Sequence, residues 1–254
     1  MKTIANKKQS SSGFTGAHLK WLALFTMLID HIGLVLLETG LLPFIANAVL
    51  GGSSYEYIPA DYTRLSNINL VLRLIGRVSF PLYCFLLVEG FSHTKSVPKY
   101  ILRLGLLAVL SEIPFNLARY NSLFCLTLQN VFFTLFIGLL VIWGMQYTGR
   151  RFPKSTFLPY AIALAGMLCA HFLQTDYGAF GILLIAMLYL LGSDKKQLCI
   201  FGVISTIWEY TAPLAFLPIY FYNGERGKQP SKWFFYLFYP VHLLLLVLLR
   251  LLIL

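Results

Sequence analysis

Acidic residues are scarce in this chain, which has 10 Asp and Glu residues among its 254, and only 12% of its residues carry charge. Soluble domains of ordinary composition are about 25% charged, so a water-soluble globular protein is excluded. Apolar residues take the place of the charged ones, at 58% of the chain with a mean hydropathy of +0.72. No segment remains for a sizeable soluble domain, and the composition indicates an integral membrane protein.

Cysteine is also rare, and the four residues of this type lie singly in different apolar segments: Cys84, Cys125, Cys169 and Cys199. No CxxC pair or metal-ligand spacing links them, so we predict neither a disulfide framework nor a metal site. Glycine-rich phosphate-binding patterns are missing too. The net charge of +10 comes mainly from short loops between apolar segments, where Lys and Arg act as topology signals, so we predict no nucleic-acid partner.

The apolar segments predict an all-α, polytopic transmembrane helix bundle of about nine spans. Residues 197–222 form two runs that are each short for a full crossing, which favours a reentrant or tilted hairpin. We expect residues 1–17 to form a disordered cytoplasmic tail and residues 18–254 a single transmembrane domain. The basic loops alternate along the chain, and this pattern predicts a cytoplasmic N-terminus and a C-terminus outside.

The segment from Leu19 to Leu37 is unusual because it places Asp30 and His31 inside an otherwise apolar span. A helix rises about 1.5 Å per residue, so His31 lies about 16 Å from Lys20, near the middle of a hydrocarbon core of about 30 Å. The two residues are about three turns apart and share one helix face. Lys20 and His31 therefore form a polar track along one face of this helix, from the membrane surface into the membrane.

Counting residues from each basic boundary places other polar groups at similar depths. These are Arg77, Gln129 and His242 near the midplane, and Arg73, Glu112 and Glu209 nearer the outer face. An unpaired charge at the bilayer centre costs at least about 2.5 to 3.5 kcal/mol. We therefore expect Asp30 to pair with Arg77, and Glu112 with Arg73. The same groups would also serve as purely structural contacts between helices.

Six stretches carry a resemblance to a known family: LKWLALFTMLIDHIG, LRLIGRVSFPLYCFLLVEGFSHT, YILRLGLLAVLSEIPFNL, NVFFTLFIG, DYGAFG and KWFFYLFYPVHL. In these stretches the sequence resembles the TraX family of bacterial membrane proteins, named for the acetylase of conjugative pilin. Lys20 and His31, with ten residues between them, also resemble the Arg/Lys-x10-His signature of the wider transmembrane acyltransferases.

The resemblance implies an acyltransferase of the bacterial inner membrane. It implies transfer of an acyl group, expected to be acetyl, from cytoplasmic acyl-CoA to an acceptor at or beyond the membrane. The acceptor would be a protein N-terminus, a glycan, or a lipid-linked hydroxyl or amine. Membrane lipids are the other expected partners.

The residues suit this chemistry. Histidine has an unperturbed pKa of about 6.5, which fits a general base, so His31, Asp30 and His242 are the catalytic candidates. His242, or Gln129 with Asn130, could orient the acyl carbonyl or stabilise its oxyanion. A covalent acyl-histidine stays an alternative to direct transfer. The candidates for binding donor or substrate are Lys20, Arg73, Arg77, Glu89, His93, Glu112, Gln129 and Asn130, and the basic rim suits coenzyme A phosphates.

Two other function classes compete with this interpretation. Buried Asp, Glu, His and Arg residues are also typical of transporters and proton-coupled carriers. Against a carrier, no internal repeat is visible between the two halves of the sequence. A non-catalytic membrane assembly factor is the third class, and it would leave the midplane His31 unexplained.

Overall fold

The chain folds into helices throughout the residues that the computed structural model describes, which are 13–50, 60–228 and 231–254. In chain order the helices are α1 (Gly16–Ile32), η1 (Gly33–Leu41), α2 (Leu42–Leu50), α3 (Ala60–Gly76), α4 (Ser79–His93), α5 (Val97–Tyr120), α6 (Val131–Arg151), α7 (Phe157–Phe172), α8 (Gly178–Leu190), α9 (Lys195–Thr206), η2 (Ile207–Glu209), η3 (Ala212–Ala215), α10 (Phe216–Tyr220) and α11 (Lys232–Ile253). Residues 1–12 of the predicted tail lie outside the described residues.

Five helical segments among the described residues are long and apolar enough to cross a membrane: Gly16–Asn47, Ala60–His93, Val97–Tyr120, Val131–Arg151 and Phe234–Ile253. Helices α7 and α8 are apolar but shorter, at 16 and 13 residues. They measure only about 24 and 20 Å, against the roughly 30 Å of a hydrocarbon core. The predicted polytopic helix bundle is confirmed, with five long segments and several shorter ones making up the expected spans.

Local sequence signals set the helix starts that matter for the interior. Thr15 caps α1 by accepting a hydrogen bond from the His18 amide, and the His18 ring accepts one from the Thr15 amide in return. Asn130 caps α6, because its Oδ1 accepts the Phe132 amide at 3.0 Å. Helix α1 continues into η1, a nine-residue π-helix that begins at Gly33, two residues after His31. Such π segments are rare and frequent at functional sites.

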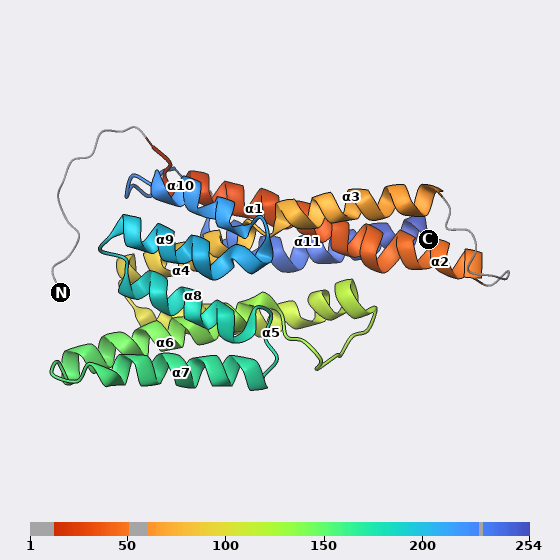
Figure 1. Ribbon diagram of the computed structural model, residues 1–254. Coiled ribbons are helices and arrows are strands. Elements are labelled where there is room, and N and C mark those ends of the chain that lie inside the picture. The colour runs from red at the N-terminus through yellow and green to blue at the C-terminus, as the bar shows by residue number, and fades with distance from the viewer. Residues whose placement is uncertain (1–12, 51–59, 229–230) are drawn as a thin grey trace.

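The bundle is stepped, as Figure 1 shows. The helices run along one common axis, and α2, the start of α3 and the C-terminus lie together at one end. Helices α6, α7, α8 and α9 stop well short of that end. Because α7 and α8 are short, the connection between them lies inside the length of the bundle and not at its tip.

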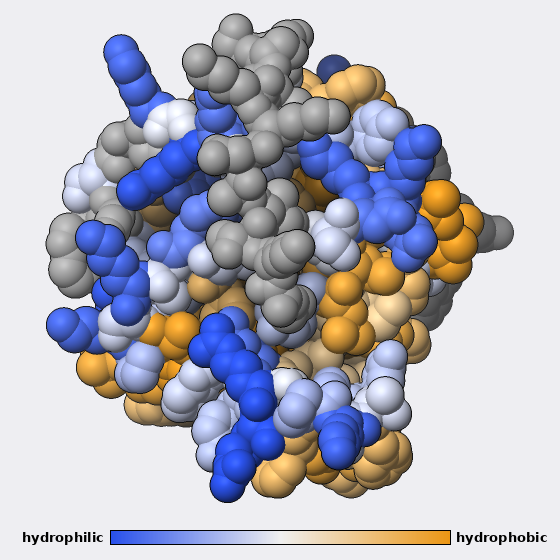
Figure 2. Space-filling model, turned by 90° about the vertical axis from the view of Figure 1, so that its left-hand side faces the viewer, coloured by the Kyte–Doolittle hydropathy of each residue, from blue (hydrophilic) through white to orange (hydrophobic). Residues whose placement is uncertain are grey.

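The opposite end of the bundle is basic. Exposed Lys and Arg residues gather in the connections at that end, and they are Lys95, Lys99, Arg150, Arg151, Lys154, Lys195, Lys196, Arg226 and Lys228. Figure 2 views this basic end and shows hydrophilic side chains standing out over it. The basic loops predicted from the sequence therefore lie on one face of the molecule.

Arg250, in the last turns of α11, is buried at the far end from these loops, with 4% of its surface exposed. Its guanidinium donates to the carbonyl oxygens of Leu117 at 2.9 Å and Ala118 at 3.1 Å, at the C-terminal end of α5. It also donates to Thr39 Oγ1 at 2.7 Å and Asn121 Oδ1 at 3.2 Å. A cation suits this position because the last carbonyls of a helix lack partners and carry partial negative charge.

Candidate functional site

Two buried histidines meet in the interior of the bundle. His31 comes from α1 and His242 from α11, and their exposed fractions are 8% and 5%. The Nδ1 atom of His31 lies 2.6 Å from the Nε2 atom of His242, and the two rings stack with centroids 4.9 Å apart. Tyr239 packs edge-on against both imidazoles. The structure thus brings together two of the three predicted catalytic residues.

The hydrogen bonds of this pair assign the protons on both rings. His242 Nδ1 lies 2.6 Å from the carbonyl oxygen of Phe238, which can only accept, so this nitrogen carries a proton. In a neutral imidazole the other nitrogen is then an acceptor, so His242 Nε2 accepts from His31 Nδ1–H. His31 Nε2 is left with a free lone pair. The relay of Phe238, His242 and His31 therefore presents a basic nitrogen at its end.

Asp30 pairs with Arg73 and not with the predicted Arg77. Its Oδ2 accepts from Arg73 Nη1, and Arg73 Nε lies 3.2 Å from Glu38 Oε2. The two side chains of the first pair are 17% and 15% exposed. Gly76 allows this approach, because a Cβ there would lie 2.2 Å from Asp30 Oδ1. Asp30 Oδ1 itself is buried without a hydrogen-bond partner among the described residues.

Arg77 pairs instead with Glu209, at 3.1 Å between Nε and Oε2. The expected pair of Glu112 with Arg73 is also wrong, since Glu112 Oε2 accepts from Asn130 Nδ2 at 2.5 Å and from its amide at 3.3 Å. Arg73 and Arg77 are one helical turn apart, but α3 ends at Gly76 between them. The break turns the two guanidinium groups toward different elements.

Asn130 and Gln129 hold connections together and do not line the cavity described next. Asn130 is fully buried and also donates from Nδ2 to the Ala108 carbonyl at 2.8 Å. Gln129 accepts from the Asp176 amide at 2.9 Å through its backbone carbonyl, which joins the α5–α6 connection to the α7–α8 connection. Neither side chain lies beside the histidine pair, so their roles as oxyanion donors stay predictions without geometric support.

His31 borders a polar cavity of about 130 Å³. A water takes up about 30 Å³ in the liquid, so the space suits a few waters or a small polar group. It is lined by Met27, Asp30, His31, Leu34, Arg73, Arg77, Ser79, Phe80, Tyr83, Phe115, Arg119, Val131, Asp176, Tyr177 and Tyr239. Of the predicted site residues, Asp30, His31, Arg73 and Arg77 lie on its wall.

Arg119 and Asp176 are cavity residues that sequence reasoning missed. Arg119 lies in the last turn of α5, and none of the ion pairs between described residues includes it. Asp176 lies in the α7–α8 connection, which the stepped bundle carries inward. The DYG turn of the sequence was the available signal, but a turn between two full spans would have placed Asp176 at the membrane surface.

The remaining predicted residues lie toward the basic end, away from the cavity. The Lys20 ammonium stands 5.3 Å from the centre of the Phe235 ring, a cation–π contact between α1 and α11. Glu89 lies 3.2 Å from His93 and accepts from the Tyr222 hydroxyl at 3.3 Å. Lys20 lies about 16 Å from His31 along α1.

Comparisons with known proteins give a matching family model and a matching relative. A family model described as "TraX: TraX protein" matches residues 15–250. A protein of Dichelobacter nodosus named "Probable fimbrial assembly protein FimC, serogroup H1" is 30% identical over 259 residues, covering 92% of this chain and 94% of the relative. No solved structure matches the chain.

Proposed function

This chain belongs to the TraX family, and from that premise we propose that it is a membrane acyltransferase. It moves an acyl group, acetyl in the first instance, from acyl-CoA to an amine or hydroxyl of an acceptor at or beyond the membrane. The observation that carries the proposal is the relay of Phe238, His242 and His31 beside the polar cavity. Such a relay supplies a neutral imidazole with a defined basic nitrogen.

His31 Nε2 acts as the general base. It accepts the proton of the acceptor N–H or O–H while the acceptor atom attacks the thioester carbonyl carbon. The tetrahedral intermediate then collapses, the carbon–sulfur bond breaks, and the departing thiolate takes the proton from His31 Nε2. His242 holds the His31 ring in one tautomer through the Nδ1 hydrogen bond. The products are the acylated acceptor and the free thiol of coenzyme A.

The arginines of the cavity supply positive charge for the oxyanion of that intermediate. Arg73 and Arg77 already hold carboxylates, whereas no ion pair within the described part of the chain involves Arg119. Arg119 shares the cavity with Asp176 and lies over the Tyr120 ring, and it is the cation that we assign to the reacting carbonyl. Asp30 keeps Arg73 in place, which makes it a positioning residue.

The donor enters from the basic end, which we assign to the cytoplasm because short loops rich in Lys and Arg stay on that side. The N-terminus then lies in the cytoplasm, and the membrane is the bacterial inner membrane. Lys20 and the exposed cations of the basic end suit the phosphates of coenzyme A. The pantetheine arm spans the roughly 16 Å from Lys20 to His31.

The acceptor arrives from the other side of the membrane. The D. nodosus relative is named as a probable fimbrial assembly protein. A fimbrial subunit is for that reason the first acceptor to test, ahead of glycans and lipid-linked hydroxyls.

Acyl-CoA consumption by the purified full chain in detergent tests the proposal. We expect His31→Ala to abolish transfer while the variant stays folded and binds donor. His171→Ala is the matched control, because this histidine is exposed on α7 and does not line the cavity. Transfer by the His31→Ala variant at the parent rate would exclude the base and favour a carrier or a non-catalytic assembly role.

A further inference from the structure

A second, smaller crevice adjoins the cavity of His31. Its volume is about 10 Å³, enough for at most one water, and it lies between α4, α8 and the α9–η3 region. The lining is mostly apolar and aromatic, from Phe80, Pro81, Tyr177, Phe180, Gly181, Leu184, Ser205, Thr206, Trp208, Glu209 and Ala212. Phe80 and Tyr177 line both spaces, so they form the wall between them.

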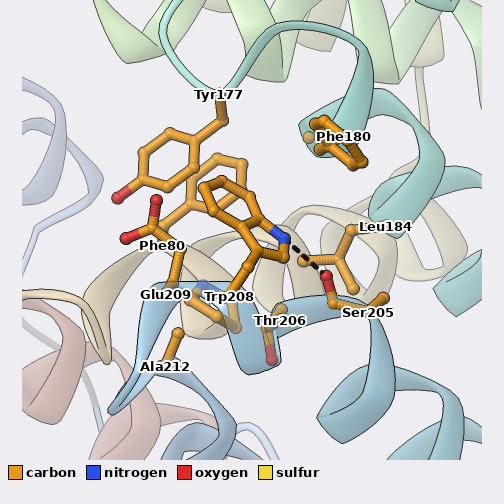
Figure 3. Close-up of a pocket in the computed structure, with 11 residues that line it drawn as sticks. Phe80, Tyr177, Phe180, Leu184, Ser205, Thr206, Trp208, Glu209 and Ala212 are labelled. Carbon is orange, nitrogen blue, oxygen red and sulfur yellow. Dashed lines mark hydrogen bonds between the residues drawn. The ribbon is translucent and has the colours of Figure 1, made fainter.

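This wall is a tightly stacked aromatic pair. The Phe80 and Tyr177 rings are 3° from parallel with centroids 3.6 Å apart. Figure 3 shows the Tyr177 ring beside Phe80, with Trp208 and Phe180 also lining the crevice. The Phe180 and Trp208 ring centroids are 5.4 Å apart, and the Trp208 indole donates to the Ser205 carbonyl at 2.9 Å. Two aromatic pairs therefore line the crevice.

The backbone conformation at Tyr177 and the small size of Gly181 allow the two rings to stack. Tyr177 has φ of 62°, in the left-handed region that few residues other than glycine adopt. At Gly181 a Cβ would lie 2.9 Å from the Phe80 ring and 3.1 Å from Tyr177 Cβ, so only glycine leaves room for both side chains. The ion pair of Arg77 with Glu209 crosses the same boundary, since Arg77 lines the cavity and Glu209 the crevice.

We propose that the stacked rings of Phe80 and Tyr177 set the acyl chain length that the enzyme accepts. This inference rests on the proposed function. With the thioester beside His31, a short acyl group stays within the polar cavity, and a longer alkyl chain needs an apolar continuation. The apolar crevice is the continuation that adjoins the cavity across this wall, and the stacked rings close it.

Opening the wall should therefore change acyl selectivity and leave the relay intact. Removing either ring frees the volume of that ring and joins it to the crevice. The last carbons of a butanoyl group can then lie between α4 and α8. Tyr177→Phe keeps the stacked ring and should keep the length limit. Phe180→Ala also changes the crevice but leaves the wall closed, so it is the matched control.

The experiment measures kcat/KM of the purified full chain with acetyl-, propanoyl- and butanoyl-CoA. In the Tyr177→Ala and Phe80→Ala variants, we expect the butanoyl-to-acetyl ratio to rise about tenfold or more. Tyr177→Phe and Phe180→Ala should keep the parent ratio. A ratio, unlike a rate, does not move when a variant is merely less stable. An unchanged ratio in both folded alanine variants, or an equal rise for every donor, would overturn the length limit.

Binding of two unreactive thioethers, S-ethyl- and S-butyl-coenzyme A, separates this inference from the proposed function. Tyr177→Ala should gain about tenfold in affinity for the S-butyl compound relative to the S-ethyl compound. If the affinity shifts but the protein transfers no acyl group, the acyltransferase proposal is wrong and the proposed pocket for the alkyl chain is supported. If acyl transfer occurs and neither the kcat/KM ratio nor the affinity ratio shifts, the acyltransferase proposal is supported and the wall does not set chain length.

Discussion

Breaking the ion pair of Arg73 with Asp30 should lower the free energy of unfolding more than breaking the ion pair of Arg73 with Glu38. Removing one partner of a fully buried ion pair costs about 3 to 5 kcal/mol, because the other charge stays buried. Both side chains here are still 15 to 17% exposed, so we expect the lower end, about 3 kcal/mol, for Arg73→Gln. Glu38, which shares Arg73, adds little because its side chain is 42% exposed.

A double-mutant cycle isolates this pair. Unfolding free energies are measured in mixed micelles for Arg73→Gln, Asp30→Asn and the double variant. The double variant should be milder than Arg73→Gln alone, with a coupling energy of about 2 kcal/mol. The matched cycle of Asp30→Asn with Arg77→Gln should give under about 0.5 kcal/mol, since Arg77 pairs with Glu209. A larger coupling for Arg77 than for Arg73 would refute the pairing.

Three further outcomes follow from the geometry. Gly76→Ala should cost about 2 kcal/mol or more in unfolding free energy, because the added Cβ would collide with Asp30. Gly149 lies in open space, so Gly149→Ala should instead stabilise α6 by about 0.5 to 1 kcal/mol. Equal effects of the two substitutions would contradict the close approach of Asp30 to Gly76. Lys20→Ala should raise KM for acyl-CoA and leave kcat nearly unchanged in steady-state kinetics, and a loss confined to kcat would speak against donor binding. His242→Ala should lower kcat about 100-fold or more and leave donor binding unchanged, since general-base catalysis contributes a rate enhancement of about that size. A kcat equal to that of the parent protein would contradict the role of His242 in the relay.

The helical architecture and the meeting of the two histidines were predictable, because both depend on position along the membrane normal. Apolar run length places each span, and residue counting gives the depth of His31 and His242. Depth alone does not predict which side chains of neighbouring helices pair with each other. Arg73 and Arg77 lie one helical turn apart, about 6 Å in depth, and both are within reach of the level of Asp30. The end of α3 at Gly76 decides which of them meets Asp30.

The positions of Arg119 and Asp176 on the cavity wall were not predicted, for a related reason. Counting assumes that every apolar segment crosses the whole membrane, so chain ends and turns fall at its surfaces. Helices α7 and α8 are too short for that, and the connection between them lies against the cavity. Segment length was visible in the sequence, but the direction in which a short pair of helices is set into a bundle depends on packing against other helices.

The place of His242 on α11 has a consequence for biosynthesis. Helix α11 follows every other described helix in the chain, so the ribosome makes it after them. Until it inserts, the imidazole of α1 has no ring to fix its tautomer, and the C-terminal end of α5 lacks the Arg250 guanidinium that binds its carbonyls. A partly synthesised chain therefore lacks the histidine pair on which the proposed mechanism depends, and this pair forms only when the bundle has closed around its final helix.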